Sequence, residues 1–239
     1  MSGVWATRLR ALPFALGEAA RTGLAVLRRE PDRREAALAF AQEHASTGDP
    51  ASLLAALDRF ARERRFLMNV GPEKGPWLED AVRRAGPAAR VLEFGSFVGY
   101  SAILMSRHLA EDSRLVSVDV SATATRVARQ MAELAGVADR VEFVTGRSSD
   151  VIATLDSPFD VVFLDHWKNL YKADLEQILE RGLLRPDAVV IADNVGPMFG
   201  DNPYVPWMRA RGDFESTWLE AHVEYQDIED AVLVSRWRG

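Results

Sequence analysis

Short apolar runs alternate with helical patterns from residue 90 onward, and this alternation constrains the fold more than any other feature of the sequence. Charged residues or glycine bound each run, as expected of strands buried on both faces. The runs are Val91–Phe94, Leu115–Val118, Val141–Val144, Val161–Leu164 and Ala188–Ile191. Helical spacing between them predicts helices over Tyr100–Leu109, Ala122–Ala135, Ser149–Leu155 and Leu170–Arg181. We therefore predict an α/β fold with a mostly parallel sheet and helices on both faces.

The two ends of the chain complete this architecture. Extended segments at Trp218–Tyr225 and Ala231–Trp237 have no helix between them and predict an antiparallel pair at the sheet edge, which makes seven strands in all. N-terminal helices are predicted over Arg33–His44, Ala51–Arg64 and Pro76–Ala85. A chain of 239 residues fits one large domain, which we place at residues 31–239.

Residues 1–30 form a basic leader, predicted to be a helix docked on the surface of the domain. Glu18 and Arg21 interrupt its apolar stretch, so the leader does not read as a membrane span. It also lacks the small-residue cleavage site of a signal peptide. Weak contact with a membrane surface or a partner helix is the alternative interpretation.

The charge balance and the lack of cysteine narrow the class of function. A net charge of −6 disfavours a nucleic-acid partner, because phosphate backbones repel an acidic protein. Without cysteine the chain forms neither disulfides nor thiolate metal sites. We expect a cytoplasmic, monomeric protein with a small-molecule substrate.

The loop after the first apolar run is typical of a nucleoside site. Gly95 and Gly99 permit a tight turn and close approach of the backbone to a ligand. Phe97 and Tyr100 stand where the dinucleotide fingerprint has glycines, which disfavours a nicotinamide-dependent dehydrogenase. Asp119 ends the second run, where a carboxylate can accept hydrogen bonds from ribose hydroxyls; an ordinary carboxylate before the next helix is the alternative.

Oxygen-bearing side chains follow the fourth and fifth runs. Asp165 comes directly after one run, and Asp193 and Asn194 follow the next. Such side chains at neighbouring strand ends can converge on Mg²⁺, although Asp and Asn also cap ordinary turns. Lys168 stands out as one of three lysines in a chain with 26 arginines, because lysine beside a metal can release its proton whereas arginine cannot. A solvated surface lysine is the alternative.

These residues resemble the catechol O-methyltransferases, a family of Rossmann-like, S-adenosylmethionine-dependent methyltransferases. The resemblance extends from about Pro31 to the C-terminus. Its most specific segments are Met68–Gly71, Glu93–Ala102, Ala135–Val137, Phe163–Lys168, Gly182–Arg185, Ala192–Val195 and Val223–Tyr225. It implies transfer of the methyl group of S-adenosylmethionine to one hydroxyl of a catechol, with help from Mg²⁺.

The resemblance also implies residue roles. Lys168 and Glu224 would be catalytic, the first by accepting the proton of the methylated hydroxyl and the second by a hydrogen bond to the other hydroxyl. The metal ligands would be Asp165, Asp193 and Asn194. The cofactor would lie against Met68, Val70, Glu93, Gly95, Phe97, Tyr100, Ser101, Asp119, Val120, Ser148, Ser149, Asp165, His166 and Trp167. The substrate would lie against Phe66, Met68, Trp167, Lys168, Asn194, Pro197, Met198 and Glu224.

Departures from the family pattern concern the mouth of the site. Phe66 replaces a usual tryptophan, and a usual proline is hard to align with Gly196–Phe199. Asp119 and Ser149 replace a usual glutamate and glutamine. The mouth therefore leaves open a larger vicinal-diol substrate, such as a flavonoid or a caffeoyl ester. A non-catalytic cofactor-binding scaffold is the alternative from another class.

Overall fold

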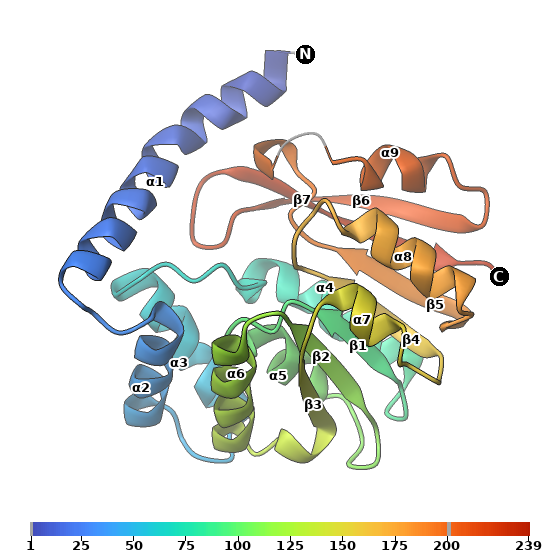
Figure 1. Cartoon of the computed structure of the whole chain (residues 1–239), viewed down its shortest axis with the longest axis horizontal. Helices are drawn as coiled ribbons and strands as arrows, with labels where there is room; N and C mark the ends of the chain where they lie inside the picture. Colours follow the sequence, from blue (N-terminus) through green and yellow to red (C-terminus); the bar gives the residue numbers. More distant parts are fainter. Residues whose placement is uncertain (1, 200–201) are drawn as a thin grey trace.

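The apolar runs form the centre of a seven-stranded sheet in the computed structural model, which describes residues 2–199 and 202–239 (Figure 1). The strand order is β3-β2-β1-β4-β5-β7-β6. β1 to β5 are parallel, whereas β7 lies antiparallel between β5 and β6. The strands are β1 (Val91–Phe94), β2 (Leu115–Asp119), β3 (Val141–Thr145), β4 (Phe159–Leu164), β5 (Leu184–Ala192), β6 (Phe214–His222) and β7 (Glu229–Trp237). The predicted fold class is confirmed.

Helices cover both faces of this sheet (Figure 1). Those of the described residues are α1 (Ser2–Leu27), α2 (Arg33–His44), α3 (Pro50–Glu63), α4 (Gly71–Ala85), α5 (Tyr100–Ser106), α6 (Ala122–Ala135), α7 (Ser148–Ile152), α8 (Tyr171–Glu180) and α9 (Tyr204–Arg209), with short 3₁₀ turns η1 (Ala138–Arg140) and η2 (Pro197–Phe199). Alternate residues of β4 point to opposite faces, so Val161 and Phe163 join one core cluster while Val162 and Leu164 join the other.

The observed elements differ from the predicted ones mainly at their ends. β5 begins at Leu184 instead of Ala188. Its residues 185–187 are exposed and separate the buried Leu184 from the apolar run. α4 begins at Gly71, with Pro72 in its first turn and Pro76 inside the helix, whereas the predicted helix began at Pro76. α9 was not predicted, because six residues are too few to show a helical period.

The leader is the helix α1, as predicted, and it docks by one face. Ala11 and Phe14 pack in a cluster with Phe66, and Thr7 donates a hydrogen bond to Glu229 at 2.6 Å. The opposite face exposes the leucines Leu9, Leu12, Leu16, Leu24 and Leu27. No helix in the described part of the chain is long and apolar enough to cross a membrane. Contact with a membrane surface stays a prediction.

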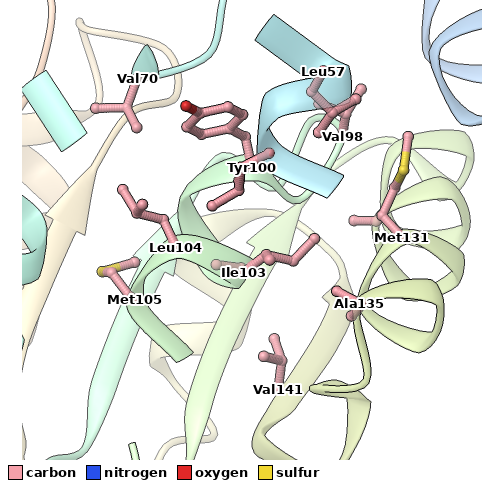
Figure 2. Packing of buried hydrophobic residues seen from close by; sticks show 14 of the residues in the cluster. Leu57, Val70, Val98, Tyr100, Ile103, Leu104, Met105, Met131, Ala135 and Val141 are labelled. Atoms are coloured by element: carbon pink, nitrogen blue, oxygen red, sulfur yellow. The ribbon is translucent and has the colours of Figure 1, made fainter. Parts of the chain in front are cut away.

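α5 anchors the loop that follows β1. Every residue of this helix is buried, and Figure 2 shows Tyr100 in the same cluster as Val70 and as Leu57 of α3. Gly99 precedes α5 with φ 82°, and an added Cβ would lie 3.1 Å from Cβ of Ala128. The close approach of α5 to α6 therefore depends on glycine here.

Candidate active site at the carboxyl ends of the parallel strands

The parallel strands end at one edge of the sheet, where a cavity of about 880 Å³ opens. Several predicted cofactor residues line it. They are Met68, Gly95, Asp119, Val120, Ser148, Ser149, His166 and Trp167, and Lys168 joins them. The cavity therefore lies where the strand–loop pattern predicted a ligand site.

The glycine after β1 lets two strand ends approach each other. Gly95 has φ 111°, and an added Cβ would lie 2.4 Å from the backbone oxygen of Asp165. No side chain fits that space. The backbone of the β1 loop thus lies directly against the residue that follows β4, and Gly95 itself lines the cavity.

Glu93 is fully buried beneath this loop. Ser101 and Ser117 each donate a hydrogen bond to one of its carboxylate oxygens. Burial raises the pKa of Glu93 to about 7, although the two hydroxyl groups oppose the rise. A group that ionises near neutral pH in this position can accept a cationic ligand group.

Asp119 already holds the backbone of the neighbouring turns. Its two oxygens accept hydrogen bonds from the backbone N–H of Phe97 at 3.1 Å and of Ser121 at 2.8 Å. Ser121 in turn caps α6, so the cap is the serine, as expected. Asp119 nevertheless lines the cavity, where one of its oxygens can accept a further hydrogen bond.

The far side of the cavity carries His166 and Trp167. His166 Nε2 lies 2.6 Å from Asp174 Oδ2, and its ring lies against Phe94 and Tyr171, so its orientation is fixed. Trp167 is 71% exposed and covers the cavity from outside. The fixed imidazole of His166 and the exposed indole of Trp167 offer flat ring surfaces suited to an aromatic base.

Six predicted cofactor residues lie outside the lining of this cavity: Glu93 and Asp165, which border the strand ends, and four others. Tyr100 and Val70 are buried in the core, Ser101 is hydrogen-bonded to Glu93, and Phe97 has φ 45° with its side chain against the core. Their predicted contacts with a cofactor stay untested.

The predicted metal residues follow adjacent strands, and β4 and β5 bring them side by side. Leu164 pairs with Ala192 in register, and the Asp193 N–H donates to Leu164 O at 3.0 Å. Burial raises the pKa of Asp165 well above its usual value, and the nearby charge of Asp193 adds to the rise. Lys168 Nζ donates to Asn194 Oδ1 at 2.9 Å. Lys168 is thus partly buried, with its ammonium group on Asn194, while its catalytic role stays a prediction.

A buried lysine that the sequence analysis missed completes the site. Lys74 of α4 is fully buried, with Nζ 2.7 Å from Asp193, 2.8 Å from Asp230 and 3.7 Å from Glu224. Burial acts to lower its pKa, but these three carboxylates raise it above the usual value. The scarcity of lysine that singled out Lys168 applies equally to Lys74 and could have found it.

Glu224 follows β6 and packs against Gly71 at the start of α4. An added Cβ on Gly71 would lie 2.8 Å from the Glu224 carboxyl carbon, so glycine makes room for it. Glu224 Oε1 is buried and has no hydrogen-bond partner in the described part of the chain. Burial raises the pKa of Glu224 to about 9, although the charge of Lys74 opposes the rise. A buried polar atom of this kind is suited to a ligand.

Phe66 and η2 are predicted to shape the mouth of the site. Phe66 meets Phe14 of α1 edge to face, with ring centroids 5.0 Å apart. Met198 and Phe199 pack against the same cluster, and Lys168 Nζ lies 4.9 Å from the centroid of the Phe199 ring. Pro197 begins η2 beside them. Phe66, Met198 and Phe199 therefore lie together against α1, but only Phe199 lines the 880 Å³ cavity, and their role as the mouth of the site stays a prediction.

Asp165, Asp193 and Asn194 are the oxygen donors expected to bind a divalent cation. Among residues 2–199 and 202–239, no three His, Cys, Asp or Glu side chains form a group that could hold a metal ion. The expected set has only two carboxylates, and its third donor is an amide oxygen. Asp193 Oδ1 accepts a hydrogen bond from Lys74, and Asn194 Oδ1 accepts one from Lys168. Both oxygens therefore already stabilise a positive charge. Hard oxygen donors of this kind suit Mg²⁺.

Comparison with known proteins identifies the family. The family model described as O-methyltransferase matches residues 42–199. Catechol O-methyltransferase of Mus musculus is 36% identical over 84% of this chain and 77% of its own length. Catechol O-methyltransferase B of Danio rerio is 36% identical over 87% of this chain and 80% of its own.

A solved structure agrees with these sequence relatives. The O-methyltransferase TomG of Streptomyces achromogenes, involved in tomaymycin synthesis and solved in complex with SAM, is 27% identical with a TM-score of 0.64. The similarity covers 78% of this chain and 90% of TomG. A nicotinamide-dependent dehydrogenase has no support from these matches. The chain belongs to the O-methyltransferase family.

Proposed function

We propose that this methyltransferase moves the methyl group of S-adenosylmethionine to one hydroxyl of a catechol and that it depends on Mg²⁺. One observation carries the proposal. Lys168, Asn194, Asp193 and Asp165 meet at the ends of β4 and β5, beside a large cavity. An acid–base side chain next to hard oxygen donors is what activation of an aromatic diol requires.

The cavity supports the methyl donor as cofactor. Glu93 would bind the amino group of its methionine end, Asp119 would accept hydrogen bonds from the ribose, and His166 with Trp167 would hold the adenine. Similarity to an enzyme solved with SAM supports the same assignment. When bound, S-adenosylmethionine supplies the methyl group, and Mg²⁺ held by Asp165, Asp193 and Asn194 makes the substrate hydroxyl more acidic.

Lys168 would take the proton from the hydroxyl that is methylated. Its amine lies 2.9 Å from Asn194 Oδ1, so it reaches the place where the diol would bind. The phenol group has an ordinary pKa of about 10, so attack at neutral pH needs a base in contact with it. Arginine at this position would keep the charge but could accept no proton.

Glu224 would hold the second hydroxyl. Because burial raises its pKa to about 9, the carboxyl group is protonated at neutral pH and can donate a hydrogen bond to a diol oxygen. Its Oε1, which lies 3.7 Å from Lys74 Nζ and has no hydrogen-bond partner in the described part of the chain, would take part in that bond. Holding both oxygens fixes the orientation of the ring, and orientation alone can lower a barrier by several kcal/mol.

The apolar cluster of Phe66 with α1 and η2 favours a single-ring catechol over a flavonoid or a caffeoyl ester, if it borders the bound substrate as the resemblance implies. Phe66 is buried beneath Phe14 and Ala11 of α1, and η2 packs on the same cluster. A long substituent would have to pass these side chains. The same apolar cluster would also keep water away from the reacting groups.

A methyl-transfer assay tests the proposal. Catechol, a phenol with one hydroxyl and a caffeoyl ester would each be offered with S-adenosylmethionine, with Mg²⁺ and with a chelator. We expect turnover of catechol only with Mg²⁺, none of the phenol and slower turnover of the ester. Undiminished turnover with the chelator would exclude metal dependence, and turnover of the ester alone would favour the larger substrate.

Two variants link the activity to the donor set. Asp165→Ala and Asp193→Ala should each abolish turnover while the fold is kept, as judged by circular dichroism. Asp160→Ala is a matched control, because Asp160 is the second residue of β4, at the end of the strand opposite to the site. A cofactor-binding scaffold would instead bind S-adenosylmethionine and turn over none of the three compounds.

A further inference from the structure

Asp230, at the beginning of β7, is hydrogen-bonded to the loop that follows β5. β7 runs antiparallel to β5, and the last paired residues are Ala192 and Leu233. The residues before Leu233 therefore extend beyond the end of β5, beside Asp193 and Asn194. The Val195 N–H donates to Ala231 O at 3.1 Å and continues the contact.

Asp230 makes three contacts with this loop and with α4. Its Oδ1 accepts the Gly196 N–H at 3.1 Å, and its Oδ2 accepts from Asn194 Nδ2 at 2.9 Å and from Lys74 Nζ at 2.8 Å. An added Cβ on Gly196 would lie 2.5 Å from the Asp230 Cα. The loop thus lies directly on the backbone of Asp230, whose side chain is fully buried.

The hydrogen bond to Asn194 decides which end of the amide faces the site. Because Nδ2 is held by Asp230, Oδ1 must point the other way, where it accepts from Lys168 at 2.9 Å. The two ends of an amide differ, since only the oxygen can bind a cation. Asn194 also has φ 53°, so its backbone is held in a conformation that few residues adopt.

We propose that Asp230 is a positioning residue, which fixes the Asn194 amide with its oxygen toward the divalent cation. This inference rests on the proposed metal-dependent function. Lys74 supports the arrangement, because its ammonium group lies between Asp230 and Asp193 and offsets the charge of two buried carboxylates. Outer groups that orient metal ligands typically change affinity by about 10- to 100-fold when removed.

The test measures Mn²⁺ binding by electron paramagnetic resonance, which needs no turnover. In Asp230→Asn, residue 230 keeps only one accepting oxygen for the two donors Asn194 Nδ2 and Gly196 N–H. Either the Asn194 amide or the backbone of the loop that carries it therefore loses its acceptor. We expect Mn²⁺ affinity to fall by about 10- to 100-fold, with unchanged affinity for S-adenosylhomocysteine. Asp160→Asn, at the far end of β4, should leave Mn²⁺ binding unchanged.

A reciprocal exchange separates orientation from general damage to the fold. In Asn194→Asp combined with Asp230→Asn, the hydrogen bond is kept with donor and acceptor exchanged: one oxygen of residue 194 accepts it and the other faces the cation. Lys74 loses its bond to residue 230 but keeps its bond to Asp193. Mn²⁺ affinity should then return to within about threefold of the wild type. Equal affinity in the single variant and the wild type, or no recovery in the exchange, would overturn the role of Asp230. Absence of Mn²⁺ binding by the wild type would instead overturn the metal-dependent function on which that role rests.

Discussion

Replacing Glu93 by glutamine tests whether this buried carboxylate binds the amino group of the methyl donor. Its oxygens accept hydrogen bonds from Ser101 and Ser117, and burial raises its pKa to about 7. An ammonium group next to Glu93 requires the ionised carboxylate. Donor binding should therefore strengthen as the pH rises toward 7.

The pKa sets the size of this effect. With a pKa of about 7, the ionised fraction is about one tenth at pH 6 and about one half at pH 7. The dissociation constant should thus be about fivefold larger at pH 6 than at pH 7. Glutamine has no proton to release, so in Glu93→Gln the ratio should be close to one. Its affinity at pH 7 should be roughly 10- to 100-fold weaker, because a hydrogen bond to a charged group contributes about 1.5–3 kcal/mol.

Isothermal titration calorimetry with S-adenosylhomocysteine is a suitable assay, since this product has the same amino-acid end and is not turned over. The wild type, Glu93→Gln and Asp160→Asn would be titrated at pH 6 and pH 7 without metal. Asp160 lies at the far end of β4 and serves as the matched control. The reasoning is refuted if Glu93→Gln keeps the pH ratio of the wild type, or if the wild type shows no ratio.

Three further predictions concern the site and the fold. Lys168→Arg should lower kcat by about 10²- to 10⁴-fold at unchanged donor affinity, since arginine accepts no proton; a near-normal kcat would remove the lysine from the mechanism. Gly95→Ala should lower the free energy of unfolding in urea by about 1–3 kcal/mol, because the added Cβ would meet the backbone oxygen of Asp165. In the control Gly212→Ala the added Cβ enters open space, so stability should change little. Equal stability of the two variants would contradict the close approach of Gly95 to Asp165. Burial raises the pKa of Glu93 from 4.5 to about 7, so the contribution of this group to stability is complete below pH 4.5 and is lost as the pH rises through 7. The free energy of unfolding of Glu93→Gln should therefore match that of the wild type at pH 4 and exceed it by about 3 kcal/mol at pH 8. A difference that does not change with pH would show that Glu93 is not the titrating group.

The sequence predicted the parallel sheet well because strands buried on both faces must be apolar along their length. β1 was predicted to the residue, and α2 and α6 likewise. The caps explain the last two, since Asp32 and Ser121 accept backbone hydrogen bonds at the first turn of each helix. β5 was predicted only in its buried half, because its exposed beginning has no apolar signal.

The candidate site was predictable where residues follow directly after a strand. Asp165 and Asp193 adjoin apolar runs that the sequence itself marks as neighbours in a βαβ unit. Lys74 and Asp230 gave no such signal. One lies inside a helix and the other at the start of a late strand, and their side chains meet only across 156 residues of chain.

The sequence alone determined which residues are apolar, where the chain turns, and which side chains leave the ends of the parallel strands. These properties follow from local chemistry, because hydrophobic period, caps and glycines act within a few residues. Only the tertiary structure decided that β7 enters between β5 and β6 and that α1 packs on Phe66 and η2. It likewise decided which buried charges offset one another, because burial and Coulomb interaction depend on distance in space and not along the chain.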